Sequence, residues 1–207
     1  MSEPVIIYAH GFNSSPESFK ARLLQSVMQA QGRGQQLRVP ALSHWPAEAV
    51  EQLQAEIDAA QGPVTLVGSS LGGYYSTWLV EHNPGVRAVL VNPAVRPFVL
   101  LEAWLGQNTN LYTADNYELT GEHLAQLQAL YCPQLQHPER YLLLVQTGDE
   151  TLDYREAVDK YAACARFVQP GGSHGFEHFE ALIPALQAFA EGRVELPEPV
   201  ALPVSAP

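Results

Sequence analysis

The sequence is poor in cysteine, in basic residues and in long apolar runs, and each shortage excludes a class of protein. Two cysteines, Cys132 and Cys164, occur among 207 residues, and their separation matches no metal-ligand spacing. We therefore expect two reduced thiols, as is usual in the cytoplasm, and neither disulfides nor a metal site. The longest apolar stretches, such as residues 98–101, are far shorter than the ~18 residues that a membrane span requires.

Positive charge is scarce as well. The chain has 11 Lys and Arg residues against 22 Asp and Glu residues, which gives a net charge of −11 and an isoelectric point near 5.0. Nucleic acids and anionic membrane surfaces attract basic faces, so this balance argues against both as partners. The segment Met1-Ser2-Glu3-Pro4 is not the basic start of a signal peptide, so we expect a cytoplasmic protein.

The chain does contain a regular alternation of short apolar runs and segments with helical spacing. Strands are predicted at residues 5–9, 37–39, 64–67, 88–91, 141–145 and 166–168. Helices are predicted near residues 19–28, 50–57, 71–81, 156–163 and 179–190. Apolar strands separated by helices indicate an α/β fold, in which helices cover both faces of a mostly parallel sheet.

Two regions interrupt this alternation. Residues 93–140 contain no convincing strand but much helical and aromatic material, including Trp104 and Tyr117. An insertion of this length suggests a helical cap over the site, although helices that merely cover the sheet edge would give the same pattern. Residues 194–207 are rich in proline, so we expect a disordered tail after a single domain at residues 1–193.

The segment LVGSSLGGYY, at residues 66–75, carries the strongest chemical signal. It places G-x-S-x-G between the predicted strand at 64–67 and a helix that begins at Leu71. On such a sharp strand-to-helix turn the serine hydroxyl projects from the end of the sheet, and glycines avoid collisions with neighbouring backbone. Ser70 is therefore the candidate nucleophile, and Ser69 is interpreted as a small turn residue.

An acid for this serine is expected after a later strand, because such folds place the acid between the serine and the histidine along the chain. Asp149 follows the strand at 141–145, at the carboxyl end of the predicted sheet. Asp153 is the alternative, but its place near the next helix start is typical of an N-cap residue. Glu150 is expected to point to the side of the turn.

A histidine follows the last predicted strand. His174 lies in the loop GGSHGF, from which an imidazole could reach Ser70 while its other nitrogen is held by a carboxylate. His178, at the start of the last helix, is the alternative base. The order Ser70, Asp149, His174 matches a catalytic triad.

Two backbone N–H groups are expected to form an oxyanion hole. Leu71 follows the nucleophile at a helix N-terminus, where the helix dipole also favours negative charge. Phe12 follows the first strand in the run His10-Gly11-Phe12, and its N–H is the second candidate, with Asn13 as the weaker alternative. His10 is interpreted as a side chain that shapes this loop and takes no part in proton transfer.

These motifs resemble those of the small bacterial esterases of the YqiA-like family. The stretches that carry the resemblance are YAHGFNSSPESFKA, GSSLGGYYSTWL and TGDETLDYREA, and the similarity spans residues 5–190. The resemblance implies an α/β-hydrolase fold, hydrolysis of acyl esters or acyl thioesters, and Ser70, Asp149 and His174 as the triad. It leaves the tail after Arg193 unexplained.

The sequence as a whole favours a serine esterase that hydrolyses a small-molecule acyl ester through an acyl-enzyme. No phosphate-binding glycine loop or ligand cluster is present, so we expect neither cofactor nor metal. An acyl thioesterase or a small peptidase would use the same machinery, and a non-catalytic binding module could keep the same fold. Trp104 and Tyr117 are expected to line the acyl side of the pocket.

Overall fold

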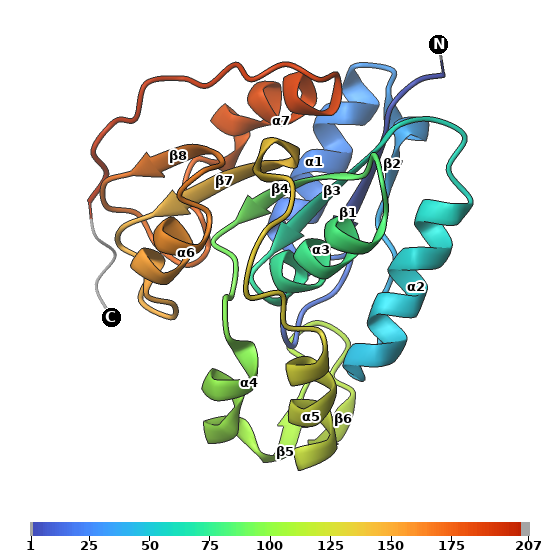
Figure 1. Ribbon diagram of the computed structural model, residues 1–207, viewed down its shortest axis with the longest axis vertical. Coiled ribbons are helices and arrows are strands. Elements are labelled where there is room, and N and C mark those ends of the chain that lie inside the picture. Colours follow the sequence, from blue (N-terminus) through green and yellow to red (C-terminus); the bar gives the residue numbers. More distant parts are fainter. Residues whose placement is uncertain (1, 204–207) are drawn as a thin grey trace.

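A single parallel sheet organises the protein. The computed structural model describes residues 2–203, and six strands within them pair in the order β2-β1-β3-β4-β7-β8 (Figure 1). Every neighbouring pair in this sheet is parallel. The strands are β1 (Val5–Ala9), β2 (Leu37–Arg38), β3 (Val64–Ser69), β4 (Arg87–Val91), β7 (Tyr141–Gln146) and β8 (Ala165–Gln169). The predicted sheet is thereby confirmed.

Helices cover both faces of the sheet (Figure 1). One face packs against α1 (Phe19–Ala30), the short 3-10 helix η4 (Phe179–Leu182) and α7 (Ile183–Ala190). The other face packs against α2 (Pro46–Asp58), α3 (Leu71–His82) and α6 (Tyr154–Lys160). Alternate residues of each strand enter opposite cores because side chains alternate across a sheet. In β1, for example, Ile6 and Tyr8 lie in the first core, and Ile7 and Ala9 lie in the second.

The strand order also decides where a site can form. From β1 the chain moves outward to β2 and then returns to the other side of β1 as β3. Loops at the carboxyl ends of β1 and β3 therefore diverge, and a crevice opens between them. Residues 10–13 follow β1 at this crevice, and Ser70 follows β3, so the sheet topology brings the two motifs together.

The insertion at residues 93–140 extends from the sheet as a separate lobe, at the bottom of Figure 1. It contains α4 (Pro97–Leu100), η2 (Leu101–Trp104), α5 (Gly121–Ala129) and η3 (Pro138–Arg140). It also contains an antiparallel hairpin of β5 (Gly106–Thr109) and β6 (Asn116–Leu119), which the sequence pattern did not predict. GQNT has no apolar side chain, and NYEL alternates polar and apolar residues over four residues only, which is too short to stand out in the sequence.

The proline-rich tail contacts the loop after β8 as far as residue 203. The backbone N–H of Leu202 donates to Pro170 O at 2.8 Å, and the Gly172 N–H donates to Pro203 O at 2.9 Å. The Gln169 side chain also donates to Val200 O at 2.8 Å. The tail up to residue 203 is thus bound beside the end of β8, and residues 204–207 lie outside the described part of the chain.

Candidate active site

Ser70 lies at the junction of β3 and α3 in a strained backbone conformation. Its φ of 54° and ψ of −117° fall outside the regions that side chains with a Cβ normally adopt. Neighbouring backbone holds this conformation, because Ser70 N–H donates to Val91 O at 3.0 Å and Ser70 O accepts from Gly73 and Ala94. A positive φ at a polar residue, fixed by its surroundings, is a feature of functional sites.

Glycines permit the turn to pack this tightly. A Cβ on Gly72 would lie 2.0 Å from the carbonyl oxygen of Ala9, at the end of β1. A Cβ on Gly68 would lie 2.5 Å from both Gly72 O and Ser76 Oγ. Neither position tolerates a larger residue without backbone movement, which explains why the motif requires glycine on both sides of Ser70.

The imidazole of His174 is held by the carboxylate of Asp149. Nδ1 of His174 lies 2.9 Å from Oδ2 and 3.0 Å from Oδ1 of Asp149. The Asp149 side chain is 1% exposed, whereas that of His174 is 24% exposed. Asp149 Oδ1 also accepts from the N–H groups of Thr151, at 2.9 Å, and Leu152, at 2.8 Å. A buried carboxylate oriented in this way keeps the imidazole fixed and favours a proton on Nδ1.

The alternatives to these two residues lie elsewhere. Asp153 is the N-cap of α6, where its side chain accepts from the N–H of Arg155 at 3.0 Å. His178 is 63% exposed and faces Glu180 at 3.4 Å. Glu150 was expected to point to the side of the turn. Its carboxylate instead accepts a hydrogen bond from the backbone N–H of His174 at 2.9 Å.

Two buried amides that sequence reasoning missed hold the His174 loop. The Asn92 side chain, at the end of β4, donates to the carbonyls of Ser173 and His174 at 3.0 and 3.2 Å. Gln146 Oε1, at the end of β7, accepts from Ser173 N–H at 3.0 Å and from Glu177 N–H at 2.9 Å. The available signal was a polar side chain directly after each apolar strand run, at the carboxyl edge of the sheet.

The two residues predicted to supply the oxyanion donors lie at the same cavity. Phe12 and Leu71 both line one cavity with Ser70 and His174. Among the described residues neither backbone N–H donates to a protein acceptor, so both are available to a ligand. Gly11 lets the loop after β1 approach Ser70 closely, since a Cβ there would lie 3.1 Å from Ser70 Cβ. The N-terminus of α3 at Leu71 adds a favourable dipole for negative charge.

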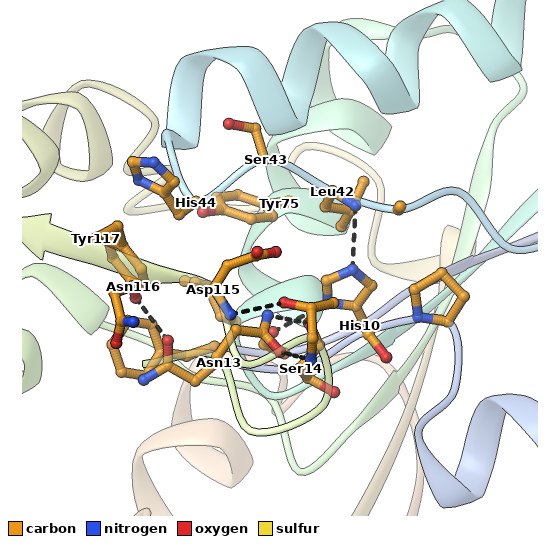
Figure 2. Close-up of a pocket in the computed structure, with 18 residues that line it drawn as sticks. His10, Asn13, Ser14, Leu42, Ser43, His44, Tyr75, Asp115, Asn116 and Tyr117 are labelled. Atoms are coloured by element: carbon orange, nitrogen blue, oxygen red, sulfur yellow. Dashed lines mark hydrogen bonds between the residues drawn. The ribbon is translucent and has the colours of Figure 1, made fainter. Parts of the chain in front are cut away.

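Both ring nitrogens of His10 face backbone groups, so this side chain holds the loop after β1 (residues 10–14). Leu42 N–H donates to its Nε2 at 3.1 Å, and its Nδ1 lies 3.1 Å from Gly11 O (Figure 2). Nε2 accepts a hydrogen bond, so the ring is neutral with its proton on Nδ1. Burial lowers the pKa of His10, which also favours the neutral form.

Ser70 and His174 line two cavities, and only the second of these two is lined by a lysine, Lys20. The first, of about 640 Å³, contains Trp104 and apolar residues of the insertion, namely Ala94, Pro97, Leu100, Leu101, Leu105 and Leu111. We call it the apolar cavity. Trp104 is 57% exposed and meets Phe12 edge to face at 5.8 Å. The second, of about 310 Å³, lies against the first turn of α1 and is called the polar cavity. No hydrogen bond joins Ser70 to His174 within residues 2–203, as is common before substrate binds.

Tyr117, the other residue expected in the acyl pocket, lines a different cavity. This third cavity, of about 420 Å³, lies between the β5–β6 hairpin and the loop after β1, and Asp115 and His44 also face it (Figure 2). The Tyr117 hydroxyl donates to Asn13 Oδ1 at 2.6 Å. Leu111 N–H and the Asn110 side chain donate to the carbonyls of Asn13 and Ser14. The hairpin therefore holds Asn13 and Ser14, in the loop after β1, in place.

This arrangement of motifs corresponds to a known family. The model of the Uncharacterised protein family (UPF0227) matches residues 5–191. The chain belongs to this family. The match confirms the resemblance to the YqiA-like proteins drawn from the motifs.

Solved structures similar to this UPF0227 protein share the α/β-hydrolase fold. α/β-hydrolase domain-containing protein 10 from mouse superposes with a TM-score of 0.71 at 17% identity, covering 92% of this chain and 91% of that one. Est1E from Butyrivibrio proteoclasticus gives 0.70 at 16% identity, covering 92% and 88%. The esterase domain of a Rhodothermus marinus protein gives 0.65 at 16% identity, covering 91% and 87%. At these identities the likeness establishes the fold.

Neither a metal centre nor a membrane helix emerges from the described chain. Between residues 2 and 203, no three His, Cys, Asp or Glu side chains are grouped so as to hold a metal ion. In the same range, no helix combines the length and apolar character that crossing a bilayer requires. Cys132 and Cys164 are both free thiols.

Proposed function

We propose that this protein is a serine esterase that hydrolyses small acyl esters through Ser70, His174 and Asp149. The observation that carries the proposal is the buried Asp149 carboxylate on Nδ1 of His174, in a site that His174 shares with the strained Ser70. Two unused N–H groups, of Phe12 and Leu71, line the same cavity. Nucleophile, oriented base and oxyanion donors together are the parts that acyl transfer needs.

The first half of the reaction forms the acyl-enzyme. Ser70 Oγ attacks the ester carbonyl as its proton passes to Nε2 of His174, and the Asp149 carboxylate stabilises the resulting imidazolium. The carbonyl oxygen becomes an oxyanion that accepts from Phe12 and Leu71 N–H. The bond to the leaving oxygen then breaks as Nε2 returns its proton to that oxygen, which releases an alcohol.

The second half repeats these steps with water. A water molecule gives a proton to Nε2 of His174 and attacks the acyl carbon, and the oxyanion forms in the same place. The bond to Ser70 then breaks, Oγ recovers its proton from Nε2, and the carboxylic acid leaves. The apolar cavity is the site we assign to the acyl chain, because it is lined by Trp104 and leucine side chains next to Ser70.

Two neighbouring serines provide the test. Ser70→Ala should lower kcat for 4-nitrophenyl butyrate by at least about 10⁴-fold, because no nucleophile remains. Ser69→Ala should fold and keep substantial activity, because the Ser69 side chain is buried beside the Tyr8 hydroxyl. An active Ser70→Ala enzyme with an inactive Ser69→Ala enzyme would refute the assignment. Hydrolysis of neither ester nor thioester by the wild type would favour a binding module.

A further inference from the structure

The polar cavity on the α1 side of Ser70 is not accounted for by ester hydrolysis alone. Ser70 and His174 form part of its wall, and another part is formed by Phe19 and Lys20, the first residues of α1, and by Ser18 before them. It meets the apolar cavity at Ser70, His174, Phe12 and Leu111, which line both. An ester bound at Ser70 extends in two directions from the reacting carbonyl, so the polar cavity receives the part opposite the apolar chain.

Lys20 supplies a positive charge to this cavity. Its Nζ donates to the carbonyl of Gly175, the residue after His174, at 2.9 Å, and within residues 2–203 it forms no ion pair. Burial lowers the pKa of Lys20 to about 8, and the nearby Asp149 carboxylate opposes this shift. Most molecules therefore carry the ammonium at neutral pH. Lys20 thus brings a positive charge to a cavity that the candidate nucleophile also lines, in a chain with a net charge of −11.

The N-terminus of α1 lies in the same wall of the polar cavity. Ser18 is 8% exposed, and its side chain lies against the buried Tyr8 hydroxyl. Ser18 is also the N-cap of the 12-residue α1, where the helix dipole favours negative charge. The Lys20 ammonium and the helix dipole both favour an anion in the polar cavity.

We propose that the polar cavity binds a carboxylate or phosphate on the leaving group of the substrate, with Lys20 as its main charged contact. The preferred substrates are then esters with an apolar acyl chain and an alcohol that bears an anion close to the ester oxygen. This inference rests on the proposed esterase function and narrows its substrate class. Lys20 determines specificity and takes no part in the proton transfers.

Two esters that differ in one charge test this inference. The wild type is assayed at pH 7 with 4-butyryloxybenzoate and with its neutral amide, 4-butyryloxybenzamide, and kcat/KM is measured for each. The value for the benzoate is divided by the value for the benzamide, and this ratio is compared between variants, so that differences in intrinsic reactivity cancel. Lys20→Gln should lower the ratio about tenfold, the size expected for one charge-assisted contact in a partly buried site. Lys20→Arg should restore part of it.

Arg22→Gln is the matched control, because it removes the same charge from the same helix. The Arg22 side chain is 69% exposed and pairs loosely with Glu17 at 3.7 Å, so its loss should leave the ratio unchanged. An equal fall of both rates in Lys20→Gln would show that Lys20 only supports the His174 loop through Gly175, and would overturn the inference.

A reversed pair decides which half of the ester carries the anion. Mono-4-nitrophenyl glutarate places the carboxylate on the acyl side, and 4-nitrophenyl butyrate is its neutral counterpart. No Lys20-dependent preference for the glutarate is expected. Such a preference would overturn the assignment of the polar cavity to the leaving group. Absence of hydrolysis with all four esters would instead refute the esterase proposal, which separates the two failures.

Discussion

Replacing Asp149 by Asn removes the charge that orients His174 while leaving the side-chain volume nearly unchanged. The native carboxylate has four hydrogen-bond contacts, two to His174 Nδ1 and one each to Thr151 and Leu152 N–H. The amide oxygen of Asn can keep the two backbone donors. Its NH₂ group then faces Nδ1, and this geometry favours the imidazole tautomer with the proton on Nε2.

That tautomer cannot accept the proton of Ser70, so the expected loss is large. By analogy with serine-protease triads we expect kcat to fall about 10³- to 10⁴-fold, which corresponds to about 4 to 5.5 kcal/mol of transition-state stabilisation. The measurement is steady-state kinetics with 4-nitrophenyl butyrate, with circular dichroism to show that the variant is folded. KM should change little because Asp149 does not line the apolar cavity.

Asp153→Asn is the matched comparison in the same turn. Its carboxylate caps α6, and Asn caps a helix about as well as Asp, so stability should change by less than about 1 kcal/mol. Activity should stay near that of the wild type. The reverse pattern, with an inactive Asp153→Asn enzyme and an active Asp149→Asn enzyme, would refute the assignment of the acid.

Three other side chains give predictions that separate chemistry from support. Gln146→Leu leaves the N–H groups of Ser173 and Glu177 without their acceptor. We therefore expect the free energy of unfolding, measured by chemical denaturation, to fall by about 2 kcal/mol or more, and kcat to fall as well. An unchanged kcat would show that the His174 loop needs no such support. Trp104→Ala should lower kcat/KM for octanoate esters about 3- to 10-fold more than for acetate esters, whereas an equal loss at every chain length would place Trp104 outside the acyl pocket. Because the pKa of Lys20 is lowered to about 8, its ammonium is charged below this pH and neutral above it. The wild-type preference for 4-butyryloxybenzoate should be full at pH 7 and should approach the Lys20→Gln value by about pH 9.5; a preference that stays constant to pH 10 would contradict the role of the ammonium.

Features set by local sequence could be predicted. The apolar strands and their helices were predictable because period and turn residues are local properties. The register around Asp149 and Asp153 was also readable, since a capping residue must stand directly before its helix. In the structure the Asp149 carboxylate accepts a hydrogen bond from Nδ1 of His174, and Asp153 caps α6, as that register predicts. Their roles in catalysis stay predictions.

Features that depend on distant contacts could not be predicted. The β5–β6 hairpin is held by Asn13 and Ser14, almost a hundred residues earlier in the chain, and its own strands are mostly polar. The tail binds through two backbone hydrogen bonds, to Pro170 and Gly172, and one from the Gln169 side chain, and these leave no pattern in a proline-rich sequence. Tyr117 was expected at the acyl chain because aromatic residues often line such pockets. Its hydroxyl instead donates to the side chain of Asn13, in the loop after β1.

Labelling with a fluorophosphonate tests the central claim most directly. Such a probe reacts with a serine only when a neighbouring base activates the hydroxyl, so it reports nucleophile and base together without requiring the natural substrate. We expect the intact mass of the wild type to rise by one adduct, and peptide mapping to place that adduct on Ser70. Labelling should be abolished in Ser70→Ala and strongly slowed in His174→Ala. An unlabelled wild type, or an adduct that persists in Ser70→Ala, would contradict the account.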